Sequence, residues 1–175
     1  LKAVFPMKDM PEEVFSDTQF GYQSHSTKND SFIEKAQYEL CSYKWVEVSK
    51  ERSGFALFSP VRNGFYAKEG NLELTLLKSN SYPMEHMDQE TYEYDYALYP
   101  HKERLEDSDV DEEANSFSSS VFFFKEKEEP KNAFCISNPR IVLSCFKPSH
   151  DGKGFVIRIY NSTNVPQKCS INLPA

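Results

Sequence analysis

The stretch from Gly54 to Pro83 constrains the fold more strongly than any other part of the chain. Residues Leu72–Leu76 alternate leucine with polar side chains, and a period of two places every second side chain on the same face of a β-strand. The stretch is interrupted at Asn63-Gly64 and at Glu69-Gly70-Asn71, where glycine and asparagine supply the positive φ that tight reversals need. We therefore predict consecutive antiparallel hairpins with one face of each strand buried, instead of helices.

Short apolar or alternating segments predict strands in the rest of the chain. In Phe32–Lys50 the first half fits either a helix or a strand, whereas Trp45–Ser49 alternates as a strand does. Met7–Asp17 and His25–Ser31 lack a periodic apolar face, so we expect loops there. The other predicted strands are Leu1–Phe5, Thr18–Tyr22, Tyr92–Tyr99, Val121–Lys125, Ile141–Phe146, Phe155–Tyr160 and Ser170–Leu173. The fold class is therefore all-β and antiparallel.

A charged segment that contains Pro130 separates the last three predicted strands from the others. We expect a linker at Lys125–Asn132, and hence one domain at residues 1–130 and a second at residues 131–175. In the second domain, the Asp151-Gly152 step favours a reversal between two strands and predicts a hairpin. An isolated hairpin is only marginally stable, so we expect these strands to begin a smaller terminal sandwich.

The segment from Glu103 to Glu113 has seven acidic residues among its eleven. Blocks of like charge repel one another and stay solvated, so we predict an acidic surface loop at residues 103–120. A calcium site is the alternative, but the segment lacks the turn glycine and the twelve-residue spacing of an EF-hand. The sequence therefore favours the loop.

The charge balance excludes one class of partner. The net charge is −7 at pH 7, and Lys and Arg form no basic stripe, so the sequence does not predict a nucleic-acid partner. A membrane partner is not predicted either, because no apolar run approaches the roughly 20 residues of a membrane span. Four cysteines without framework spacing indicate reduced thiols of a cytosolic protein, although a Cys135–Cys169 disulfide stays open.

Catalytic and metal-binding patterns are sparse. Retaining glycoside hydrolysis needs two carboxylates roughly 5 Å apart, and no such constellation is recognisable among the Asp and Glu residues. The histidines have no metal-ligand spacing; the nearest cluster is His86 with Glu85 and Asp88, which a solvated polar loop explains better. The tyrosines of Tyr92–Tyr99 could stack on sugars, although packing within the protein is the more common role.

Several motifs follow one another in a recognisable order. They resemble the C-terminal β-region of the α-mannosidases of glycoside hydrolase family 38, of the cytoplasmic and bacterial type, over nearly the whole chain except about Glu103 to Ser120. The motifs are Leu1–Pro6, Gln19–Tyr22, Lys44–Ser49, Gly54–Phe58, Asn63–Tyr66, Gly70–Ser79, Tyr94–His101, Ile141–Lys147 and Phe155–Tyr160.

The resemblance implies a fold and a larger parent protein. The fold implied is an antiparallel β-sandwich that forms part of a galactose-mutarotase-like supersandwich, followed by the start of the terminal β-sandwich. Enzymes of this family are zinc-dependent retaining α-mannosidases, with zinc ligands and nucleophile in an N-terminal catalytic domain that precedes a helical bundle. Those motifs are absent here, and the chain begins at Leu1. We therefore expect a cytoplasmic scaffold segment of such an enzyme, inactive and without a cofactor by itself.

The resemblance also implies partners and one site residue. The expected partners are α-mannosides or mannose-containing oligosaccharides, and the catalytic and helical domains of the same polypeptide. In the family a basic residue in the loop after the Gly-x-Ala-Leu strand can approach the substrate groove, and Arg62 matches it. Ser59-Pro60 replaces the usual Asn-Asp there, so an ordinary turn residue is the competing interpretation of Arg62. The alternative function is a free-standing carbohydrate-binding β-sandwich.

Overall fold

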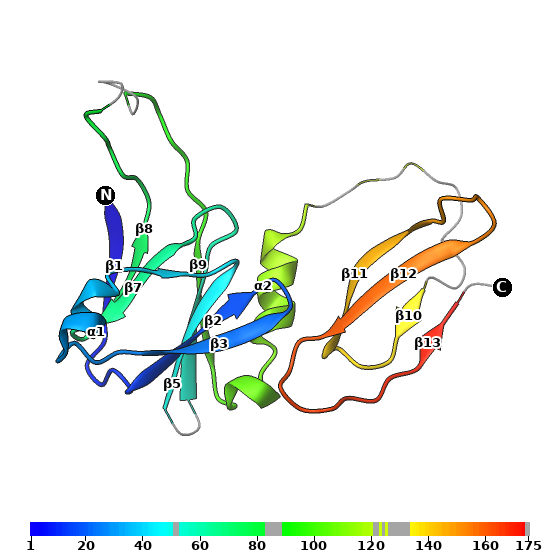
Figure 1. Ribbon diagram of the computed structural model, residues 1–175, viewed down its shortest axis with the longest axis horizontal. Coiled ribbons are helices and arrows are strands. Elements are labelled where there is room, and N and C mark those ends of the chain that lie inside the picture. The colour runs from blue at the N-terminus through cyan, green and yellow to red at the C-terminus, as the bar shows by residue number, and fades with distance from the viewer. Residues whose placement is uncertain (51–52, 83–88, 121–122, 124, 126–133, 174–175) are drawn as a thin grey trace. The chain divides into compact units, whose positions relative to one another are not determined.

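A computed structural model describes residues 1–50, 53–82, 89–120, 123, 125 and 134–173. Within these residues the protein is mostly antiparallel β-structure (Figure 1), so the predicted fold class is confirmed. The elements are β1 Lys2–Pro6, β2 Glu13–Thr18, β3 Gly21–Ser26, α1 Phe32–Ala36, β4 Leu40–Cys41, β5 Trp45–Lys50, β6 Ser53–Phe58, β7 Gly64–Lys68, β8 Asn71–Thr75, β9 Ala97–His101, η1 Leu105–Asp107, α2 Val110–Ser118, β10 Cys135–Ile136, β11 Ile141–Pro148, β12 Phe155–Asn161 and β13 Ile171–Asn172.

The chain divides into two compact units, residues 1–19 with 23–118 and residues 20–22 with 119–175. The first unit contains a four-stranded sheet of order β1-β8-β7-β4 and a five-stranded sheet of order β3-β2-β5-β6-β9. The inner faces of both sheets supply one core, which includes Val14, Val46, Leu57, Phe65, Leu72 and Leu74. Each of these side chains is fully buried, and each contributes about 1.5–3 kcal/mol of transfer free energy.

The alternation of Leu72–Leu76 predicts its strand correctly. Leu72 and Leu74 are fully buried in β8, and Leu76 packs against the same core. The two-residue turn before β8 has φ of 54° at Glu69 and 74° at Gly70, between the paired residues Lys68 and Asn71. Positive φ at both central residues is the requirement of the type I′ turn, whose twist matches that of the flanking strands.

The segment left open between helix and strand begins as the short helix α1. Ser31 is its N-cap: the Ser31 hydroxyl accepts a hydrogen bond from the Glu34 backbone, and the Glu34 carboxylate accepts one from the Ser31 backbone. This reciprocal pair satisfies backbone groups that a helix end leaves free. The second half of the segment contains β5, as predicted from its alternation.

The prediction of a loop at residues 103–120 is wrong, because η1 and α2 lie within this segment. Val110 and Ala114, one helical turn apart, are both fully buried, and α2 contacts β6. Three acidic residues occupy the first turn of α2, where negative charge is favourable to the helix dipole. Burial of one helix face therefore outweighs the charge repulsion on which the loop prediction rested.

Three other boundaries differ from the predictions. β2 occupies half of the expected loop Met7–Asp17, and the expected strand Thr18–Tyr22 is interrupted by a turn at 19–20 before β3 begins. β9 starts only at Ala97 and includes Pro100, so the strand predicted at Tyr92–Tyr99 is displaced. Pro100 is tolerated because β9 is an edge strand, where a missing backbone donor need not break a ladder.

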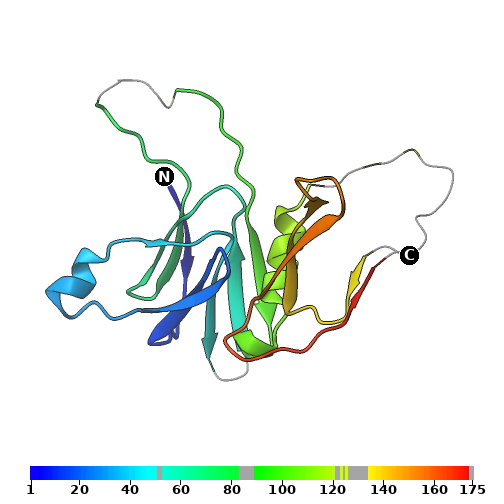
Figure 2. The same ribbon diagram turned by 45° about the vertical axis from the view of Figure 1, so that its right-hand side comes forward.

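The second unit contains the predicted hairpin, formed by β11 and β12 (Figures 1 and 2). β13 lies within the predicted strand Ser170–Leu173, but it pairs with β10 instead of the hairpin. Most of the predicted strand Val121–Lys125 and of the linker Lys125–Asn132 lies outside the described residues, and the domain boundary at 130 stays a prediction. All four cysteines are free thiols.

Candidate functional site

The loop between β6 and β7 carries Arg62, the predicted substrate contact. The loop begins at Ser59, whose side chain is fully buried. Its backbone N–H donates to the Lys44 carbonyl at 2.8 Å, and its hydroxyl accepts from the Arg62 backbone N–H at 3.1 Å. The serine hydroxyl therefore builds the turn that places Arg62, at the position where the sequence departs from the family's usual residues.

The far end of the loop is fixed by Asn63. Its side-chain amide donates to the backbone carbonyls of Ser42 (3.0 Å) and Tyr43 (3.3 Å). Its backbone carbonyl accepts a hydrogen bond from the Ser42 backbone N–H at 3.0 Å. The backbone of Arg62 is therefore held on both sides by the turn that precedes β5.

Asp17, at the end of β2, organises the turn that precedes β5. Its Oδ1 accepts hydrogen bonds from the Ser42 hydroxyl (2.6 Å) and from the backbone N–H groups of Tyr43 (2.8 Å), Lys44 (2.7 Å) and Trp45 (3.2 Å). Asp17 is 3% exposed, and burial raises the pKa of its carboxyl group against the opposing effect of these hydrogen bonds. No local pattern in the sequence indicates this role of Asp17, because the four donors converge only in the folded chain.

The side chain of Arg62 lies over an aromatic ring. Its Cζ is 4.7 Å from the ring centroid of Tyr94, a distance at which the cation and the ring attract each other. Arg62 Nε and the Tyr94 hydroxyl are both buried without a hydrogen-bond partner among the described residues. The two terminal nitrogens of Arg62 are not among these buried atoms, so the outer edge of the guanidinium stays accessible. Tyr94 also stacks on Tyr92, with ring centroids 6.3 Å apart.

A buried polar pair lies across β5, β6 and β9. His101 Nε2 is 3.1 Å from Glu47 Oε1, and both side chains are almost completely buried, although the two atoms are not aligned as a hydrogen bond. His101 Nδ1 is 3.0 Å from the Glu103 carbonyl, which can only accept, so Nδ1 carries a proton there. Burial is the main cause that raises the pKa of Glu47 to about 7.

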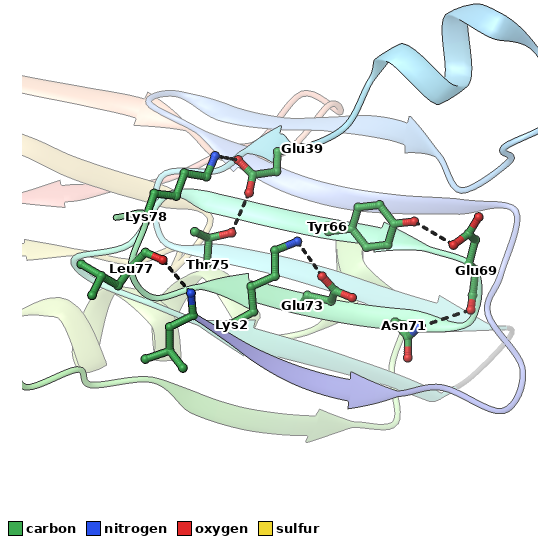
Figure 3. Close-up of polar contacts among 10 residues, drawn as sticks. Lys2, Glu39, Tyr66, Glu69, Asn71, Glu73, Thr75, Leu77 and Lys78 are labelled. Carbon is green, nitrogen blue, oxygen red and sulfur yellow. Dashed lines mark hydrogen bonds and ion pairs between the residues drawn. The ribbon is translucent and has the colours of Figure 1, made fainter. Parts of the chain in front are cut away.

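The outer face of the four-stranded sheet carries ion pairs and hydrogen bonds (Figure 3). Lys2 Nζ contacts Glu73 at 2.7 Å. It also lies above the rings of Tyr38 and Tyr66. Glu39 accepts from the Thr75 hydroxyl at 2.6 Å and from Lys78 at 2.5 Å. These charged groups have partners on the same face, and a nearby hollow of about 240 Å³ is lined by Tyr38 and Tyr66 but not by Arg62.

Zinc needs a cluster of donor side chains. Among the residues that the structure describes, no group of three or more His, Cys, Asp or Glu side chains is arranged to hold a metal ion. The cluster of Glu85, His86 and Asp88 lies outside the described residues. The described part of this chain therefore does not fit a zinc site. No helix in that part has the length and hydropathy to cross a membrane.

Two models of one protein family match the chain. The C-terminal domain of glycosyl hydrolases family 38 matches residues 1–86, and the C-terminal beta sandwich domain of the same family matches residues 140–175. The chain belongs to glycosyl hydrolase family 38. The matched domains are those of the family's C-terminal region, which confirms the family assignment made from the order of the sequence motifs.

Relatives in family 38 are much longer than this chain. Alpha-mannosidase 2C1 of Homo sapiens is 25% identical over 180 residues, which cover 99% of this chain and 17% of the relative. Alpha-mannosidase G of Dictyostelium discoideum is 26% identical over 83% of this chain and 14% of the relative. An alpha-mannosidase structure from Enterococcus faecalis V583 superposes with a TM-score of 0.79 at 17% identity, over 98% of this chain and 21% of that one. The chain spans less than a quarter of each.

Proposed function

We propose that this chain is the C-terminal β-scaffold of a zinc-dependent retaining α-mannosidase, and that it packs against and helps to shape the catalytic domain. The observation that carries the proposal is the pair of family 38 C-terminal models matched in order along the chain. Relatives named alpha-mannosidase support the substrate class. The parent enzyme hydrolyses α-mannosides in the cytoplasm, and its N-terminal catalytic and helical domains are the partners of this segment.

The catalytic groups come from elsewhere in that polypeptide. Zinc would supply Lewis-acid stabilisation of charge in the sugar–enzyme complex, and the residues described here offer no set of ligands for it. We therefore expect the 175-residue chain to have no glycosidase activity by itself.

Arg62 is the residue through which this scaffold contacts substrate. Its backbone is anchored by Ser59 and Asn63, and no ion pair to Arg62 exists within the described part of the chain. A guanidinium edge that is fixed, cationic and unpaired suits the oxygens of a sugar, because its N–H groups form a planar fork of donors.

A native preparation tests the proposed function. The polypeptide that contains this sequence is isolated from its source, and its mass, zinc content and hydrolysis of an aryl α-mannoside are measured beside those of the 175-residue chain. We expect a longer polypeptide that holds zinc and is active, and an inactive 175-residue chain. Turnover by the short chain, or a long polypeptide that lacks zinc and activity, contradicts the proposal.

Substitution in the complete polypeptide tests the site. Arg62→Ala removes the charged donors, and we expect the KM for the aryl mannoside to rise about tenfold, which corresponds to the loss of about 1.4 kcal/mol of binding. Arg158→Ala, at an exposed arginine of β12, is the matched control and should leave KM unchanged. Equal KM values for the two variants would show that Arg62 does not contact the substrate and is an ordinary turn residue.

A free-standing carbohydrate-binding module is the second candidate. The stacked rings of Tyr92 and Tyr94 favour it, since Tyr92 is 37% exposed and a flat aromatic face suits a sugar ring. Calorimetric titration of the 175-residue chain with methyl α-mannoside separates the candidates: binding that Tyr92→Ala abolishes supports the module, and absence of binding supports the scaffold.

A further inference from the structure

We infer that Tyr94 is a positioning residue for Arg62: its ring holds the guanidinium in the orientation that presents the terminal nitrogens to a mannoside. The inference rests on the proposed function, because it assigns how the same site is organised. It starts from the 4.7 Å separation between Arg62 Cζ and the Tyr94 ring centroid. Tyr94 lies ahead of β9 and Arg62 between β6 and β7, so the contact joins two segments that are distant in the sequence.

The burial of individual atoms defines the contact. Nε, at the inner end of the guanidinium, is buried and unpartnered among the described residues, while the terminal nitrogens are not buried. The ring therefore covers the inner part of the group and leaves its outer edge free. Stacking on an aromatic face is a contact that the planar guanidinium makes without using its N–H donors.

The hydroxyl of Tyr94 has no part in this arrangement. It is buried and has no hydrogen-bond partner within the described residues, and a buried atom has no direct access to substrate. The ring is therefore the functional part of Tyr94, and phenylalanine should replace it. Leucine should not, because it provides bulk without a π-face.

Preorganisation explains why the positioning matters for binding. A free arginine side chain loses considerable rotamer freedom when it binds a ligand, and a group already held in its bound orientation avoids most of that loss. Arg62 has both its backbone and its guanidinium fixed, by Ser59, Asn63 and Tyr94. Removal of the ring should therefore weaken substrate binding while the chemical step is unchanged.

Steady-state kinetics of the complete polypeptide provide the first test. We expect Tyr94→Leu to raise the KM for an aryl α-mannoside about threefold to tenfold with little change in kcat, on the scale of a cation–π contact. Tyr94→Phe should keep the wild-type KM. In the Arg62→Ala background, Tyr94→Leu should add no further increase, because the two changes remove one shared interaction. Tyr96→Leu, at a tyrosine that packs edge-on against Phe5, is the control and should behave as wild type.

Crystal structures of the complete wild-type, Tyr94→Phe and Tyr94→Leu polypeptides provide a test that needs no activity. We expect an ordered Arg62 guanidinium over the ring in the first two and a disordered or displaced one in the third. An ordered Arg62 in Tyr94→Leu, a Tyr94→Phe variant as weak as Tyr94→Leu, or additive effects with Arg62→Ala overturns the inference. An inactive wild-type polypeptide refutes the proposed function instead, and the crystallographic comparison still decides the positioning.

Discussion

Because Glu47 is buried beside His101, we predict that the free energy of unfolding falls as the pH rises through neutrality. Glu47 is fully buried, and its pKa is raised from 4.5 to about 7, chiefly by burial. Between these two values the native state binds a proton that the unfolded state has released, so the free energy of unfolding falls as pH increases. The contribution is fully present below pH 4.5 and is lost above pH 7. A pKa shift of this size corresponds to about 3 kcal/mol in the free energy of unfolding.

The surroundings of Glu47 support this direction. Its Oε2 accepts one long hydrogen bond, from the Ser49 hydroxyl at 3.3 Å, and the charge of Glu106 raises its pKa further. Because Nδ1 of His101 donates to the Glu103 carbonyl, Nε2 of a neutral imidazole presents a lone pair to Glu47. Protonation of the Glu47 carboxyl group removes the negative charge beside this lone pair, and a high pH restores that charge.

Glu47→Gln isolates the effect, because glutamine keeps the volume and cannot ionise. We expect the variant to be as stable as wild type near pH 4.5, and more stable at pH 8 by an amount approaching about 3 kcal/mol. Urea unfolding of the 175-residue chain at several pH values gives these free energies by linear extrapolation. The single tryptophan, Trp45, is the probe, since it is buried two residues from Glu47.

Glu13→Gln, at an exposed glutamate of β2, is the control and should preserve the wild-type pH dependence. The same change in unfolding free energy between pH 4.5 and pH 8 in Glu47→Gln and wild type would show that Glu47 does not cause the pH dependence. A glutamine variant that is less stable than wild type at pH 8 would show that the buried carboxylate is stabilising.

Three further predictions concern stability and use the same urea assay. Gly54→Ala should cost about 1–3 kcal/mol, because its Cβ would lie 2.1 Å from His101 Cε1, whereas Gly154→Ala, at a glycine with nothing within 4 Å, should not introduce such a clash; equal effects would refute the steric explanation. Asp17→Ala should cost about 2–4 kcal/mol, because three backbone N–H groups and one hydroxyl lose their acceptor; a loss below 0.5 kcal/mol would contradict this role. Leu72→Ala should cost about 2–5 kcal/mol, since Leu72 is fully buried, and a neutral result would show that the core between the sheets is not packed as described.

Local patterns predicted the strands whose own residues alternate or form a short apolar run. β8 and the hairpin β11–β12 were predicted because alternating or continuous apolar residues between turn signals specify a strand without knowledge of its neighbours. Helix α2 was missed for the opposite reason: the surface that buries Val110 and Ala114 is absent from the local sequence, where the seven acidic residues of Glu103–Glu113 favoured a loop.

In the candidate site, too, some features could be predicted from the sequence and others depend on tertiary contacts. Arg62 could be named from the sequence because its loop follows a recognisable strand motif, yet its contact with Tyr94 depends on how two distant segments meet. The strand predicted over Tyr92–Tyr99 overlaps β9 only at residues 97–99, because pairing with β6 decides where β9 begins. Asp17 and Glu47 carried no local signal, since any Asp or Glu can lie on the surface.

By itself the sequence determined the family, the antiparallel β-class, the tight Glu69-Gly70 turn and the core face of β8. These properties follow from residue order, local backbone preference and a period of two, all of which act over a few residues. The tertiary structure alone decided that Asp17 anchors the Arg62 loop, that Tyr94 covers the guanidinium and that Glu47 and His101 share a buried contact. The physical reason is that hydrogen bonding, stacking and desolvation depend on distances between atoms, and distant segments acquire those distances only when the sheets pack.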